Sequence, residues 1–141
     1  MDLSREAKVV SGISLLAFPT IMYGGATLLG VLTAGEAGVP AGNLVLDERQ
    51  WALFRAGHAH AGVWLIFSLV IQVLLDAATL APRSKWLARI TAPAASVLVS
   101  GGFFGLAFSP GFRWLLYLGA ACLAVAVVLT GVGLIRRPRL A

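Results

Sequence analysis

Four long apolar stretches, separated by short polar segments, dominate the pattern of hydrophobic and polar positions along the chain. They run from about Val9 to Thr33, Leu53 to Leu75, Ile90 to Phe108 and Trp114 to Ile135. Each is close to the ~20 residues that an α-helix needs to cross the hydrocarbon of a bilayer. Strands of a membrane β-barrel are about half as long and alternate in polarity, unlike these stretches. The pattern therefore predicts four transmembrane helices.

The composition supports an integral membrane protein. Hydrophobic residues make up 59% of the 141 residues and charged residues 12%, whereas a soluble domain has about 25% charged residues. A soluble chain this short has too little interior to bury so much apolar surface. We therefore expect one domain over residues 1–141, an all-α four-helix bundle whose remaining surface contacts lipid. The first stretch is too long for a secretory signal, so we expect it to stay in the mature protein.

The basic residues are distributed unevenly between the two sides of these spans. Eight lie at the N-terminus, in the connection between the second and third spans, or in the C-terminal tail: Arg5, Lys8, Arg83, Lys85, Arg89, Arg136, Arg137 and Arg139. Only Arg49, Arg55 and Arg113 lie on the other side. The positive-inside rule then predicts cytoplasmic termini and an outer loop from Ala34 to Ala52. The net charge of +5 is thus a topology signal, and we expect no nucleic-acid partner.

Candidate chemistry is concentrated in the segment from Phe54 to Gly62, which holds both histidines of the chain. Ionisable groups inside a span are costly and usually face a partner, a cofactor or water. Helix residues two apart differ by about 200° around the axis, so His58 and His60 cannot face one centre. His58 instead shares a face with Arg55 and Gly62. A neutral imidazole beside an apolar cavity suits haem iron, with Gly62 leaving space for the porphyrin and Arg55 pairing with a propionate.

Simpler roles for these residues stay open at this point. A histidine near the end of a span is about as often a helix-packing or hydrogen-bonding residue, and His60 fits that role better than a ligand role. A copper or zinc site using both histidines requires an irregular helix or a second protomer. In the third span, Gly101 and Gly105 predict a close approach of a helix or a flat ligand. Phe103 and Phe104 then line an apolar pocket or face lipid.

In these segments the chain resembles the styrene oxide isomerases, a family of small four-span membrane proteins. The resemblance covers most of the chain. It rests on the order and spacing of several features: Arg5 and Lys8 before the first span, a Gly- and Pro-containing loop from Gly35 to Arg49, Trp51, an Arg-Ala pair before His58, and Gly101, Phe104 and Phe108-Ser109-Pro110 in and after the third span. None of these features is a catalytic signature by itself.

The resemblance implies a fold, a cofactor and a reaction. It implies a homotrimer that binds haem b between protomers, with His58 as the axial iron ligand. It also implies an isomerase in which ferric iron acts as a Lewis acid on the oxygen of an aryl epoxide. The C–O bond opens, a hydride shifts and an aldehyde forms without net redox change. Such a site has to exclude water from the carbocation.

The chain departs from the family at the polar pocket positions. Phe103 stands where the family has a tyrosine, Ala95 where it has an aspartate, and Trp64 where it has an asparagine. Arg55 lies three residues before the histidine, where the family arginine lies two before. We therefore expect haem binding to carry over better than styrene oxide isomerisation.

Two further groups of residues complete the expected site. Trp64, Phe103 and Phe104 are expected as pocket walls, with His60 or Tyr117 as the replacement hydrogen-bond donor. The substrate is expected to be a small apolar epoxide. A non-enzymatic haem protein that binds or senses a gas or carries haem, and a structural membrane subunit without a cofactor, are the alternative hypotheses.

Overall fold

The computed structural model describes residues 2–136, which form four long α-helices and one short 3-10 turn. The elements are α1 (Arg5–Leu32), α2 (Glu48–Ala77), α3 (Pro82–Leu106), η1 (Pro110–Phe112) and α4 (Arg113–Ile135). Each of the four candidate spans is long and apolar enough to cross a membrane. The predicted all-α architecture of four helices is therefore confirmed, and all four helices are candidate membrane spans, which suggests a multi-pass membrane protein.

Three of the helices begin several residues before their apolar stretches. α2 begins at Glu48 rather than near Leu53, because Asp47 and Gln50 form a capping box. The Asp47 side chain accepts a hydrogen bond from the Gln50 backbone N–H at 2.8 Å, and the Gln50 side chain accepts one from the Asp47 N–H at 3.1 Å. Such a pair satisfies two backbone donors that a helix start leaves free. The loop between α1 and α2 is consequently shorter than the predicted segment 34–52.

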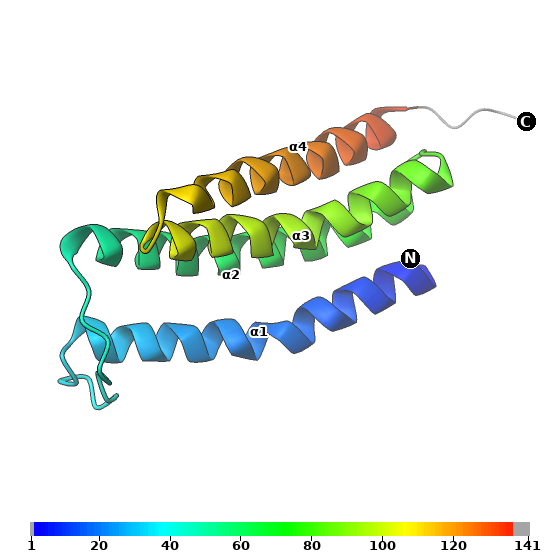
Figure 1. Ribbon diagram of the computed structural model, residues 1–141. Coiled ribbons are helices and arrows are strands. Elements are labelled where there is room, and N and C mark those ends of the chain that lie inside the picture. The colour runs from blue at the N-terminus through cyan, green and yellow to red at the C-terminus, as the bar shows by residue number, and fades with distance from the viewer. Residues whose placement is uncertain (1, 137–141) are drawn as a thin grey trace, which may run out of the picture.

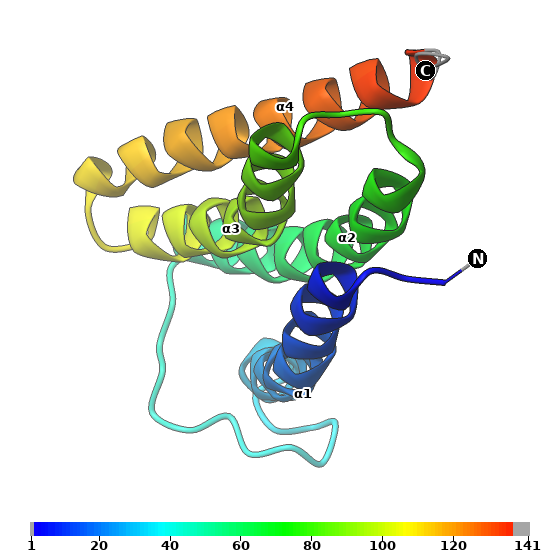
Figure 2. The same ribbon diagram turned by 90° about the vertical axis from the view of Figure 1, so that its right-hand side faces the viewer.

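The helices lie side by side, with α2, α3 and α4 packed together and α1 set apart from them (Figures 1 and 2). Close packing of α3 on α4 depends on Gly102 and Gly119. A Cβ on Gly102 would lie 2.6 Å from the Leu116 side chain, and one on Gly119 would lie 2.7 Å from that of Val99. Gly101, by contrast, has nothing within 4 Å of a Cβ, so the close approach expected at Gly101 is made by its neighbour instead.

The core lies between α2, α3 and α4, and α1 contributes little to it. Its buried cluster consists of Ile71, Leu75, Ala88, Ala92 and Ala126. On α1, the side chains of Leu16 and Tyr23 are 81% and 77% exposed. Pro19 lies inside α1 and removes one backbone hydrogen bond from that helix. α1 is therefore the span that is held least firmly by the others.

The start of α1 and the end of α4 lie together at one end of the bundle (Figure 1), which we call the terminal end. The loop of residues 33–47 lies at the opposite end, which we call the loop end. At the terminal end, Arg89 is 3% exposed and forms an ion pair with Asp76. Its guanidinium also donates to the side-chain oxygens of Gln72 at 3.1 Å and Ser4 at 3.0 Å. The Ser4 hydroxyl and N–H both donate to Asp76 at 2.8 Å. This network joins the start of α1 to α2 and α3.

Candidate functional site

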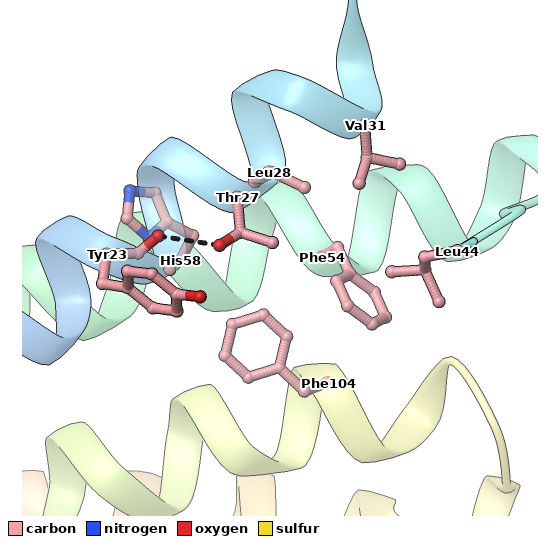
Figure 3. A pocket seen from close by; sticks show the side chains of 9 residues that line it. Tyr23, Thr27, Leu28, Val31, Leu44, Phe54, His58 and Phe104 are labelled. Atoms are coloured by element: carbon pink, nitrogen blue, oxygen red, sulfur yellow. Dashed lines mark hydrogen bonds between the residues drawn. The ribbon is translucent and has the colours of Figure 1, made fainter. Parts of the chain in front are cut away.

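A cavity of about 370 Å³ opens between α1, α2 and α3 toward the loop end. Its walls are mostly apolar, and they come from all three helices and the loop: Tyr23, Gly24, Thr27, Leu28, Val31, Leu44, Phe54, His58 and Phe104. Figure 3 shows these side chains converging from α1 above, α2 behind and α3 below. Of the expected site residues, His58 and Phe104 line this cavity.

His58 projects from α2 toward α1, and its imidazole lies against the backbone of Gly25. A Cβ built on Gly25 would be 2.8 Å from both Nε2 and Cε1 of the ring. Only a glycine allows this approach, because any side chain would overlap the imidazole. Within residues 2–136, no hydrogen bond joins the His58 side chain to another group. The ring is thus a half-buried imidazole with both nitrogens unpaired by the chain.

Two aromatic side chains form the wall of the cavity opposite α1. Phe54 and Phe104 meet edge to face, with ring centroids 5.3 Å apart. Phe104 can approach α2 because residue 57 is a glycine: a Cβ there would lie 2.9 Å from the Phe104 ring. Such pairs stabilise the packing by about 0.5–1.5 kcal/mol beyond the area that they bury. They close the cavity toward α3 with apolar surface.

His60 lies in a different environment, which confirms that the two histidines do not face one centre. Its Nδ1 is 2.7 Å from the carbonyl oxygen of Ala56. Its ring is tilted against Phe103, with centroids 4.8 Å apart, and the ring of Trp64 lies 6.2 Å away. A carbonyl oxygen only accepts, so Nδ1 is the donor in this hydrogen bond. The expected pocket residues are therefore divided: Phe104 lies at the His58 cavity, whereas Trp64 and Phe103 lie beside His60.

The remaining expected site residues lie outside the cavity. Arg55 is exposed, and Gly62 has nothing within 4 Å of a Cβ. Tyr117 lies on α4 and packs edge to face on Trp114, at 5.5 Å between centroids. Ala95 is fully buried in α3.

Sequence reasoning did not find the contribution of α1 to the site. Tyr23, Thr27 and Gly25 place two hydroxyl groups and a side-chain-free patch of backbone next to His58. A signal for them is present in the sequence. Gly24-Gly25 is a pair of small residues inside an apolar span, where such residues mark close helix approaches. A tyrosine within the same turn is the kind of amphipathic residue that usually requires a hydrogen-bond partner.

The donor set narrows the kinds of cofactor that this site suits. No group of three or more His, Cys, Asp or Glu side chains that could hold a metal ion is found in the described part of the chain. This argues against a copper or zinc site within one chain, which requires several such ligands. Haem requires a single axial imidazole from the protein, which His58 has the chemistry to supply.

The space around the His58 imidazole is too small for haem while α1 lies where the structure places it. A porphyrin lies across the axial nitrogen and extends sideways from it, where the α1 backbone at Gly25 already lies close to Nε2. Haem therefore fits at His58 only if α1 moves away from α2.

Comparison of the chain with protein-family models, with curated proteins and with solved structures finds no match.

Proposed function

We propose that this membrane protein binds a small apolar molecule within the bilayer, in the cavity beside His58. The observation that carries the proposal is the unpaired imidazole in an otherwise largely apolar cavity. His58 lies five residues, or about 7.5 Å, into the apolar stretch that begins near Leu53. An ionisable group inside a span is costly unless it serves a ligand, a cofactor or a partner.

The family resemblance adds haem b to this proposal, with His58 as the axial ligand. In this form of the proposal α1 swings away from α2 when haem binds. Two features of α1 support such a movement: its large exposed side chains and the proline inside it. The resemblance also adds the homotrimer, with haem between neighbouring protomers, and the isomerisation of a small epoxide to a carbonyl compound.

The residues of the chain itself have defined roles in such a site. Phe54 and Phe104 supply apolar walls that exclude water, which a carbocation-forming rearrangement requires. Gly25 allows the imidazole to be covered by α1 when no cofactor is bound. Arg55 is exposed near the loop end, where a propionate would reach it.

An absorption spectrum of the protein purified in detergent, with haem supplied during expression, tests the haem proposal. We expect a Soret band and a pyridine haemochrome of the b type. His58→Ala should remove the band, whereas His60→Ala is the matched control and should keep most of it. Loss of haem in His60→Ala alone would instead assign the ligand role to the histidine beside Phe103. A wild-type protein without a Soret band would exclude both haem hypotheses.

A non-enzymatic haem protein is the second candidate, and one observation favours it. Two of the expected pocket walls, Trp64 and Phe103, lie beside the expected donor His60 rather than in the His58 cavity. A gas or a haem in transit requires no such donor. The two candidates differ in one measurement, which is the conversion of an aryl epoxide by haem-loaded protein.

A further inference from the structure

Hydrogen-bonding groups are scarce in the cavity beside His58. Among its nine lining residues, only Tyr23, Thr27 and His58 have a nitrogen or oxygen in the side chain. The Thr27 hydroxyl already donates to the backbone carbonyl of Tyr23 at 3.0 Å, so its proton is used within α1. The edge of the His58 ring that carries Nε2 lies against Gly25. The phenol of Tyr23 is thus the remaining hydroxyl donor of this cavity.

The Tyr23 hydroxyl is directed into the cavity and has no partner in the described chain. Figure 3 shows it pointing toward the space between Thr27, Phe54 and Phe104, and no hydrogen bond to it is found within residues 2–136. The exposed fraction of this side chain, 77%, does not imply contact with water. Tyr23 lies about 14 Å along α1 from its end at the loop, well within the hydrocarbon depth.

The unpaired phenol of Tyr23 requires a hydrogen-bond acceptor at that depth. Water is scarce in the bilayer core, so a polar group there is satisfied by protein or by a ligand. Phe104 faces Tyr23 from α3 and offers only an aromatic ring (Figure 3). The acceptor that completes this arrangement therefore comes from the molecule in the cavity.

We infer that Tyr23 donates a hydrogen bond to the oxygen of the molecule that occupies this cavity. The ligand class is a small, uncharged, largely apolar molecule with one acceptor oxygen, such as an epoxide, an ether or a ketone. A volume of about 370 Å³ is at the lower end of ligand pockets, which span roughly 300–1,000 Å³. The inference rests on the proposed function and adds the donor that selects oxygenated molecules over hydrocarbons.

Two probes of similar size separate the hydrogen bond from the filling of the cavity. Acetophenone and isopropylbenzene share a heavy-atom skeleton and differ in having an oxygen or a methyl group at one position. Their radiolabelled forms are titrated onto the purified full chain in lipid nanodiscs, and empty nanodiscs correct for partition into lipid. We expect wild-type protein to bind acetophenone more tightly than isopropylbenzene.

Tyr23→Phe removes only the hydroxyl, so it should weaken acetophenone binding roughly tenfold, as the loss of one hydrogen bond predicts. Isopropylbenzene binding should change less than about twofold on the same reasoning, and this shows that the variant keeps its cavity. Tyr117→Phe is the matched control, because it removes a phenol that lies on α4, outside the cavity, against Trp114. It should bind the two probes as the wild type does.

Two results would overturn the inference while leaving the proposed function in place. One is a Tyr23→Phe variant that binds acetophenone as tightly as the wild type. The other is a variant that loses both probes equally, which would show that Tyr23 only shapes the cavity. If wild-type protein binds neither probe above empty nanodiscs, the proposed function fails and the inference fails with it.

Discussion

The imidazole of His58 on α2 lies against the backbone of Gly25 on α1, with Nε2 and Cε1 both 2.8 Å from the position a Cβ would take. This contact joins the span that is least packed to the helix that carries both histidines. It also determines what can reach the ring nitrogen. While α1 stays in place, a small molecule in the cavity can lie beside the imidazole, whereas a porphyrin requires α1 to move.

Gly25→Ala tests this contact directly. The added methyl overlaps the imidazole, so we expect a loss of roughly 1–3 kcal/mol in the free energy of unfolding, as for other overpacked sites. Thermal unfolding of the haem-free protein in detergent, followed by helical circular dichroism, measures it. Gly24→Ala is the matched control, because nothing lies within 4 Å of its Cβ. That variant should be neutral or slightly more stable, since alanine favours a helix over glycine.

Gly25→Ala also tests whether α1 moves away from α2 when haem binds. If haem binds with α1 displaced, Gly25→Ala should keep its haem even though the haem-free form is less stable. A haem loss as complete as that of His58→Ala would show that Gly25 stays beside the ring in the loaded protein. That result would contradict the movement of α1.

Membrane orientation is the second prediction. We expect the terminal end of the bundle to be cytoplasmic and the loop of residues 33–47 to be outside, because eight of the 11 basic residues flank the spans on the terminal side. A reporter that is active only outside the cytoplasm should stay silent when fused at Ala141. The same reporter inserted after Gly38 should be active. The opposite pair of signals would reverse the topology.

The ion pair at the terminal end gives the third prediction. Arg89→Leu leaves the half-buried Asp76 carboxylate with only its two hydrogen bonds from Ser4, and loss of a charged hydrogen-bond partner typically costs about 1–3 kcal/mol. We expect thermal unfolding at a clearly lower temperature than for the control Arg83→Leu, which removes an exposed arginine from the same end. The double variant Asp76→Leu/Arg89→Leu should be less destabilised than the sum of the single variants. Equal behaviour of Arg89→Leu and Arg83→Leu would mean that the network does not hold the helix ends together.

The four spans were predictable because the need to satisfy backbone hydrogen bonds in lipid makes hydrophobicity and helix length sufficient evidence. The separation of His58 from His60 was predictable for a similar reason, since the pitch of a regular helix decides it. The start of α2 at Glu48 was not, because the hydrogen bonds between Asp47 and Gln50 extend the helix into polar sequence. Hydropathy alone does not register such a cap.

The tertiary part of the site was not predictable from one sequence. Which residues of α1 meet α2 depends on the relative rotation and tilt of two helices, and packing sets these. Tyr23 and Gly25 were missed for this reason. Arg89 was counted only as a flanking charge, although Gln72 and Asp76, one turn apart on α2, were available as partners.

The last prediction asks which phenylalanine of the third span faces the reacting molecule. Phe104 lines the His58 cavity, whereas Phe103 packs on His60. If the haem-loaded protein rearranges styrene oxide, we expect slow formation of phenylacetaldehyde, lost in His58→Ala. Phe104→Tyr should then raise the rate roughly tenfold, because a donor near the developing negative charge on oxygen stabilises the transition state, and about 1.4 kcal/mol of such stabilisation gives that factor. Phe103→Tyr, the matched control, should leave the rate unchanged.

A gain in Phe103→Tyr alone would move the reaction to the His60 side of α2. No product above a free-haem control, with the Soret band intact, would leave the non-enzymatic haem protein as the better account, because binding a gas or carrying haem requires the imidazole but no donor for an epoxide oxygen.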